Sequence, residues 1–116
     1  MDGLRKEKAM KKINVLGTEY TVEYQDLNGE GIDGFCDYTS KRIVIRADNA
    51  NGLENFEANQ KKQLRHEIIH AFLSESGLQA NFEHCNRFGH EETMVDWIAI
   101  QFPKMLKAFE AADCLQ

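Results

Sequence analysis

Residues 64–71 read Leu-Arg-His-Glu-Ile-Ile-His-Ala and lie inside a clear helical pattern. Apolar residues recur there at intervals of three and four, which is the period of an amphipathic helix. The pattern starts near Asn55, and Gly77 follows it as a typical C-terminal stop. We therefore predict one long helix between these two residues. Its apolar arc consists of Leu64, Ile68, Ile69, Phe72 and Leu73.

The segment before this helix has the features of β-structure. Residues 12–25 predict a hairpin that turns at Gly17-Thr18, because apolar and polar residues alternate beyond the turn. Residues 35–38 predict a short strand, and residues 42–46, Arg-Ile-Val-Ile-Arg, are the most strand-like part of the chain. Loops rich in glycine, asparagine and aspartate are expected at residues 27–34 and 48–52.

The segment after the helix predicts further helical structure. A polar connection runs through Asn81, Asn86 and Gly89, and a second long helix is expected to start near His90 or Glu91. The residues expected to face inward are Met94, Val95, Ile98, Ala99 and Phe102, with Trp97 in the core.

The single proline, Pro103, is expected to break or kink that second helix. A last helix from Pro103 to about Ala112 could use the proline in its first turn. The expected order is thus strands followed by three helices, in one α+β domain with an antiparallel or mixed sheet.

The length and composition fit a single domain over residues 1–116. Of these 116 residues, 42% are hydrophobic and 28% are charged, and a domain of this size buries roughly 65% of the surface that its unfolded chain exposes. Residues 1–11 are expected to form a flexible or frayed terminus. The first twelve residues are locally basic, which fits either a solvated terminus or a binding arm.

The charge and the cysteines exclude several classes of protein. A net charge of −5 argues against nucleic acid as a partner, because phosphate contacts require a basic surface. Cys36, Cys85 and Cys114 are widely spaced and form no CxxC pair, which argues against a disulfide framework and a zinc ribbon. No signal peptide or membrane-spanning run is found in the sequence, so a cytoplasmic protein without a membrane partner is expected.

The pattern H-E-x-x-H at residues 66–70 predicts a zinc site. Histidines at positions i and i+4 of a helix are about 40° apart around its axis, so His66 and His70 project to one side. Two imidazole nitrogens so placed can bind one zinc ion, and Glu67 can reach the metal-bound water as general base. The pattern arises by chance in roughly one such chain in a hundred, and the alternative is a pair of surface histidines.

The pattern E-x-x-x-D at residues 92–96 supplies candidates for the remaining roles. A catalytic zinc needs a third protein ligand, which Glu92 can provide, and Asp96 can accept the free ring N–H of a liganding histidine. The alternative is an exposed acidic pair on an amphipathic helix. The metzincin continuation is excluded, because Leu73 and Ser76 stand where it requires glycine and histidine.

Together, His-Glu-Ile-Ile-His and Glu-Thr-Met-Val-Asp resemble the gluzincin pattern of zinc metallopeptidases. The strand at 42–46, the small size and Phe102-Pro103 resemble the minimal, ImmA/IrrE-like peptidases often encoded by phages and mobile elements. The resemblance covers roughly residues 35–105. It implies a zincin-like domain with His66, His70 and Glu92 as zinc ligands, Glu67 as general base and Asp96 as the partner of His66.

The reaction expected from these residues is hydrolysis of a peptide bond, with a protein or peptide as substrate. The oxyanion needs a further donor, for which the sequence offers His90, His84 and Tyr38, with Tyr24 as another possibility. The strand at 42–46 lines the cleft in the resembled group and can accept an extended peptide; the alternative is an interior strand. Cys36 is expected to be a small buried residue that can approach the site.

Other functions remain open from the sequence. One is an inactive, zinc-holding module that binds a phage or host regulator. Another is a metal-free interaction protein in which both motifs are coincidental. A DNA-bound peptidase of the SprT kind is disfavoured by the charge and by the missing cysteine ribbon. The substrate and the oligomeric state are not determined by the sequence.

Overall fold

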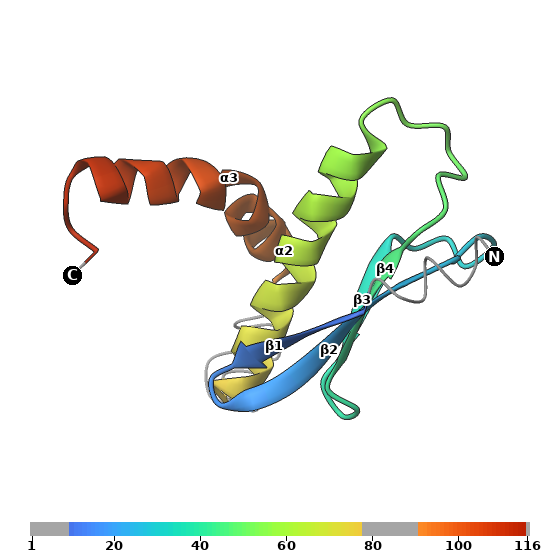
Figure 1. The fold of residues 1–116 in the computed structure, drawn as a ribbon, viewed down its shortest axis with the longest axis horizontal. Coiled ribbons are helices and arrows are strands. Elements are labelled where there is room, and N and C mark those ends of the chain that lie inside the picture. Colours follow the sequence, from blue (N-terminus) through green and yellow to red (C-terminus); the bar gives the residue numbers. More distant parts are fainter. Residues whose placement is uncertain (1–9, 78–90, 116) are drawn as a thin grey trace.

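A mixed four-stranded sheet forms the N-terminal half of the fold, followed by two helices (Figure 1). The computed structural model describes residues 10–77 and 91–115. The strands lie in the order β1-β2-β4-β3, in which β2 and β4 are parallel and both outer pairs are antiparallel. Their bounds are β1 Lys11–Val15, β2 Thr18–Gln25, β3 Gly34–Asp37 and β4 Arg42–Arg46.

β1 and β2 form the predicted hairpin, with its turn at Leu16-Gly17, one residue earlier than the expected Gly17-Thr18. Leu16 and Gly17 join the strands with φ angles of +52° and +93°, the left-handed conformation that suits a two-residue hairpin turn. The Asn14 side chain accepts a hydrogen bond from the backbone N–H of Gly17 over 2.9 Å. This turn sets the register that pairs Val15 with Thr18.

The β4 strand lies inside the sheet and supplies much of the core. Ile43, Val44 and Ile45 are fully buried, because β4 is flanked by β2 on one side and β3 on the other. The idea that this strand lines a cleft and accepts a peptide is therefore wrong. An interior strand has its backbone hydrogen bonds taken up by both neighbours, and among the described strands β3 occupies the edge on this side.

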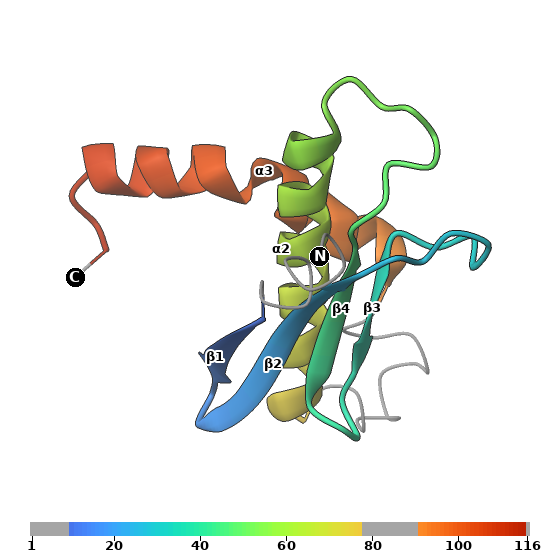
Figure 2. The same cartoon turned by 45° about the vertical axis from the view of Figure 1, so that its right-hand side comes forward.

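Helix α2, Phe56–Glu75, packs against the sheet and agrees with the predicted first helix. Ala71 is fully buried in the core cluster, and Leu64 and Ile68 pack against it. In Figure 2 the strands lie in front of α2, and the axis of α2 runs close to the direction of β4. The helix thus presents one side to the sheet and leaves another side for α3.

Helix α3, Glu92–Ala111, is continuous through Pro103, so the prediction of a separate last helix is wrong. The helix bends along its length, and its C-terminal half stands away from α2 and the sheet (Figures 1 and 2). Val95 and Ala99 are buried as expected. Proline bends this helix without ending it. The carbonyl group that loses its helical donor accepts a hydrogen bond from Arg65 of α2 instead.

Three residues expected to face inward from α3 are exposed instead. Met94 and Trp97 are each 55% exposed, and Phe102 is 44% exposed. Trp97 lies two residues from Val95, which places it on the opposite side of the helix from the buried residues. Phe102 immediately precedes Pro103 in the sequence.

Several expectations fall outside the described residues. The structure does not describe residues 1–9, 78–90 and 116. These ranges include most of the expected frayed terminus and the polar connection expected before the second helix. The described part of the chain starts again at Glu91, whose side chain accepts a hydrogen bond from the backbone N–H of Met94 over 2.8 Å and so caps α3.

Within the described residues, neither helix is long and apolar enough to cross a membrane.

Glu75, at the C-terminal end of α2, fastens this end of the helix to two turns of the sheet. Its carboxylate accepts hydrogen bonds from Tyr20 Oη at 2.7 Å, Lys41 Nζ at 2.7 Å and Thr18 Oγ1 at 3.0 Å. These contacts lower the pKa of Glu75, with Lys41 as the largest cause and Tyr20 next. Because Tyr20 is fully buried, its hydroxyl depends on this carboxylate as acceptor.

We expect the stability of the protein to depend on the charge of Glu75. A carboxyl whose pKa is lowered by folding stabilises the fold above its unfolded pKa, and this contribution is lost as the pH falls through the folded pKa. The free energy of unfolding should thus fall as the pH drops below about 4.3. In Glu75→Gln it should be smaller at neutral pH and fall less steeply. Urea unfolding followed by circular dichroism measures both.

The matched control is Glu54→Gln, at an exposed position just before α2. This variant should keep the wild-type dependence on pH. Parallel curves for Glu75→Gln and the wild type would contradict a role for the Glu75 charge.

Candidate metal centre

The two histidines of the motif lie one turn apart on the side of α2 that faces α3. The side chains of His66 and His70 are 12% and 13% exposed. Their ring centroids are 4.9 Å apart, in an edge-to-face arrangement. The i, i+4 spacing accounts for this proximity, because α2 is regular across the motif. Both rings are therefore shielded from most of the solvent.

Glu92, the first residue of α3, is brought to both histidines. Its Oε1 atom lies 3.0 Å from His66 Nε2 and 3.2 Å from His70 Nε2. One ligand atom from each of these residues lies within 4.8 Å of the others, and this group can hold a metal ion. Glu92 is 26 positions from His66 and 22 positions from His70 in the sequence. The three ligands proposed from sequence thus lie together.

Asp96, one turn after Glu92, contacts the other nitrogen of His66. The distance from Asp96 Oδ1 to His66 Nδ1 is 3.1 Å. When Nδ1 carries the ring proton and donates it to Asp96, the Nε2 lone pair faces Glu92 Oε1, which is also an acceptor. Two acceptor atoms at hydrogen-bond distance need either a proton or a metal ion between them. This chemistry fits a metal ion and agrees with the role predicted for Asp96.

Lys62 supports Asp96 and was not found by the sequence reasoning. Its Nζ atom donates to Asp96 Oδ1 over 3.0 Å. The pKa of Asp96 is lowered, chiefly by this hydrogen bond from Lys62 and further by that from His66. Lys62 stands four residues before His66, so its position on the same side of the helix was available as a signal. The sequence could not show that Asp96 would come within reach of it.

Glu67 has a different environment from the exposed Glu92. The residue is 5% exposed, and its Oε2 atom accepts a hydrogen bond from Gln63 Nε2 over 2.7 Å. Burial is the largest cause that raises the pKa of Glu67, and the hydrogen bond from Gln63 opposes this rise. Gln63 was also missed from sequence, although it stands one turn before Glu67. The carboxylate is thus held in place beside the ligand histidines.

The edge strand β3 borders this side of α2. Gly34 approaches α2 so closely that a Cβ atom there would lie 3.4 Å from Gln63 Cγ, and also 2.7 Å from the Val44 carbonyl oxygen. Cys36 is partly buried and packs against the core. Burial, followed by the charge of Glu67, raises the pKa of its thiol to about 12. Cys36 is therefore a partly buried, protonated thiol.

The candidate oxyanion donors are not brought together with the metal group. His84 and His90 lie outside the described residues. Tyr38 is 45% exposed, in the turn that Lys41 ties to Glu75 at the far end of α2. Tyr24 packs against the core from β2, and β4 separates β2 from the edge strand. The described residues thus give no support to Tyr38 or Tyr24 in this role.

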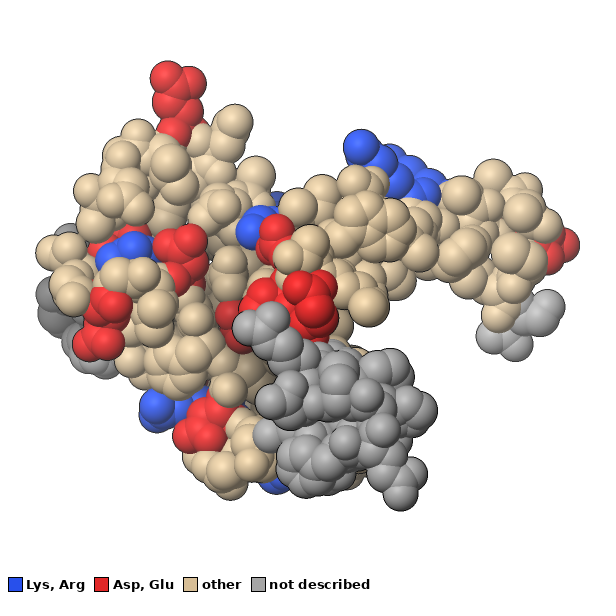
Figure 3. All heavy atoms as spheres, turned by 180° about the vertical axis from the view of Figure 1, so that it is seen from behind, with Lys and Arg blue, Asp and Glu red and all other residues tan. Residues whose placement is uncertain are grey.

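The surroundings of the metal group are acidic. Glu91 and Glu92 are exposed at the start of α3, and Figure 3 shows acidic side chains gathered where the projecting helix leaves the body of the protein. Carboxylates at the N-terminus of a helix interact favourably with its dipole. The same charges favour a cation at the site.

The comparisons with known proteins give no family for this chain. No protein-family model, no curated protein and no solved structure matches it.

The first prediction from this geometry concerns binding of Co²⁺, a probe whose visible absorption reports on its ligands. The wild type should bind about one ion per chain, with the spectrum of a tetrahedral site. His66→Ala and Glu92→Gln should each weaken binding by at least about tenfold, because each removes one ligand atom. Glu110→Gln, at an exposed position on α3, is the control. Binding lost in His66→Ala but kept in Glu92→Gln would assign the third ligand to a neighbour such as Glu91 or His90.

A second prediction concerns Asp96. Asp96→Asn should weaken Co²⁺ binding by about 10- to 100-fold, because the amide no longer offers His66 Nδ1–H a charged acceptor. Asp113→Asn, at an exposed position near the end of the described chain, should bind like the wild type. Titration against a chelating dye measures both affinities. Equal affinities for Asp96→Asn and the wild type would show that His66 does not depend on Asp96 for its orientation.

Proposed function

We propose that this protein is a zinc-dependent peptidase of the gluzincin type, with a zincin-like fold and a resemblance to the ImmA/IrrE-like enzymes. The observation that carries the proposal is the convergence of His66, His70 and Glu92 beside the buried carboxylate of Glu67. A metal centre that only stabilises a fold has no chemical use for such a carboxylate. A hydrolytic centre needs one as its base.

Zinc is the metal that this ligand set favours. Two imidazole nitrogens and one carboxylate oxygen form a set typical of catalytic zinc sites, which keep one position open for water. Atoms bound to one tetrahedral zinc at about 2.0–2.1 Å lie about 3.3 Å apart. The Nε2–Oε1 separations of 3.0 and 3.2 Å come close to this value. The ligand atoms of all three residues lie within 4.8 Å of one another, a group that could hold a metal ion.

When bound, zinc lowers the pKa of a water molecule and polarises the scissile carbonyl group. Glu67 then takes the proton from the attacking water and delivers it to the departing amine. The raised pKa of Glu67 suits this exchange, because a more basic carboxylate accepts a proton more readily. Gln63 holds the carboxylate in position, and Asp96 keeps His66 in the tautomer with Nε2 free.

The edge strand β3 is the best candidate to receive a substrate. Its neighbour β4 pairs with it on one side only, and α2 with Glu67 lies next to it. An extended protein or peptide segment can add to such an edge through backbone hydrogen bonds. We propose a cytoplasmic protein or peptide as the substrate, and neither nucleic acid nor a membrane as a partner.

A second candidate function is a protein-binding module that holds zinc without cleaving its partner, a phage or host regulator. The observation in its favour is the exposure of Met94 and Trp97 on α3, close in sequence to Glu92. Large aromatic side chains are enriched at protein interfaces. The buried Glu67 argues for the peptidase, because binding alone does not need a base.

Replacing Glu67 with glutamine separates the two functions. In Glu67→Gln we expect the rate of peptide hydrolysis to fall by at least about 100-fold, because the amide cannot accept the proton. The zinc content should remain close to that of the wild type. The substrate is a synthetic peptide mixture analysed by mass spectrometry, with zinc measured by elemental analysis.

Glu57→Gln is the matched control, since Glu57 is an exposed glutamate of the same helix. It should keep wild-type activity, and 1,10-phenanthroline should remove the activity until zinc is restored. Equal cleavage by the wild type and Glu67→Gln would reject Glu67 as the base. Zinc binding without cleavage of any peptide would favour the binding module.

A further inference from the structure

Pro103 leaves one carbonyl group of α3 without its helical donor. In an α-helix the N–H of residue i donates to the carbonyl of residue i−4. Pro103 lies inside α3 and has no N–H, so the carbonyl of Ala99 lacks that hydrogen bond. The proline ring also crowds this carbonyl and bends the helix.

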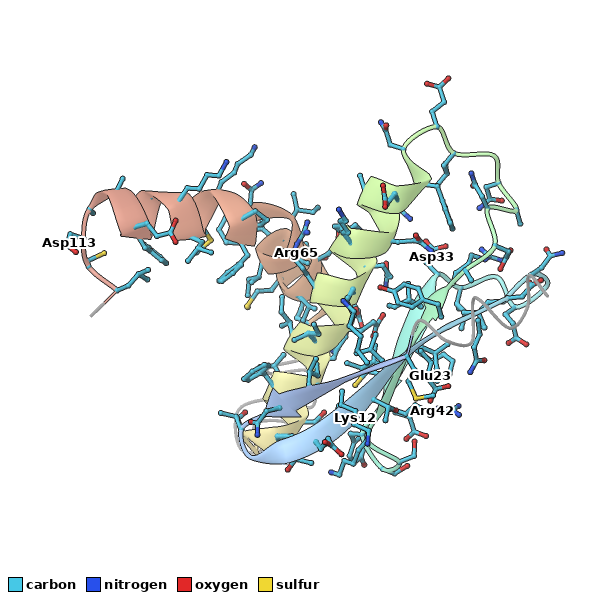
Figure 4. All side chains as sticks on the ribbon, in the orientation of Figure 1. Lys12, Glu23, Asp33, Arg42, Arg65 and Asp113 are labelled. Atoms are coloured by element: carbon cyan, nitrogen blue, oxygen red, sulfur yellow. The ribbon has the colours of Figure 1, made fainter. Side chains whose placement is uncertain are left out.

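The free carbonyl of Ala99 cannot turn to water. Ala99 is fully buried against α2, and a buried carbonyl without a donor is costly. Arg65 of α2 supplies the donor, because its Nε atom lies 2.5 Å from the Ala99 carbonyl oxygen. Figure 4 shows Arg65 where α2 and α3 meet. A side chain of one helix thus replaces the missing N–H of the other.

This contact lies next to the metal group on both helices. Arg65 immediately precedes His66, and Ala99 follows Asp96 by three residues. The other polar contacts described above between the two helices all use Glu92 or Asp96 themselves. The bond from Arg65 to Ala99 holds α3 on α2 without occupying a group of the site.

We infer that Arg65 is a positioning residue for the metal centre. It completes the backbone of α3 at the proline bend and holds this helix where Glu92 and Asp96 face the histidines of α2. The inference depends on the metal centre proposed above. Arg65 touches neither the metal group nor the substrate in this role, and it acts only through the placement of α3.

Four proteins test the inference: the wild type, Arg65→Met, Pro103→Ala and the double variant. Methionine keeps an apolar stem but removes the guanidinium. With Pro103 present, Arg65→Met should weaken Co²⁺ binding by about tenfold, because the buried carbonyl loses its only donor described here. Alanine at position 103 has an N–H to donate to the Ala99 carbonyl. In this background Arg65→Met should weaken Co²⁺ binding by less than about threefold.

Two further measurements distinguish positioning from a general loss of stability. Arg65→Lys should recover part of the lost affinity and the tetrahedral Co²⁺ spectrum, since lysine can still donate. Lys61→Met removes a charge from an exposed position of α2 and should bind Co²⁺ like the wild type. Urea unfolding of the metal-free proteins should show the same dependence of the Arg65 effect on Pro103.

The results can overturn the inference in three ways. Equal losses of Co²⁺ affinity with proline and with alanine at 103 would show that Arg65 does not compensate for the proline. An effect on unfolding with no effect on Co²⁺ affinity would reduce Arg65 to a structural role. If the wild type binds no Co²⁺, the metal centre and its positioning by Arg65 both fail, while the urea series still decides whether Arg65 and Pro103 are coupled.

Discussion

The packing of α2 against two partners is the constraint on which the rest of this structure depends. One side of the helix, with Ala71 at its centre, completes the core of the sheet. Another side carries His66 and His70 to α3. Because both sides belong to one rigid helix, the same packing that excludes water from the core fixes where the histidine nitrogens point. Glu67, between these two sides, becomes buried as a consequence.

The second feature of the fold is the cluster of polar and charged side chains at the junction of α2 and α3. Two imidazole rings, two carboxylates and an ammonium group meet there within hydrogen-bond distances. Lys62 balances part of the negative charge and lowers the pKa of Asp96. A metal ion would balance the rest, which is why an arrangement of facing acceptors supports a cation site. The proposed chemistry thus follows from the same contacts that join the helices.

The bend of α3 links its two halves to different roles. The N-terminal half packs on α2 through Val95 and Ala99 and carries the acidic residues of the site. The C-terminal half projects from the body of the protein (Figure 1), and Phe102, just before the proline, is exposed. Pro103 lies between them, and its missing N–H makes the Ala99 carbonyl available to another helix. A residue that sequence rules associate with the end of a helix here contributes to contact between helices.

The sequence by itself determined the features that depend on local spacing. It predicted the hairpin, the strand at 42–46 and the helix that carries His66 and His70, because periods of two and about 3.6 residues are properties of the chain itself. It also predicted Glu92 and Asp96 as a pair one turn apart. The tertiary structure decided that this pair meets the histidines, that β4 is interior, that Trp97 is exposed and that Lys62 and Arg65 reach α3. These outcomes depend on contacts between distant segments, and the sequence pattern of one segment does not encode its partner.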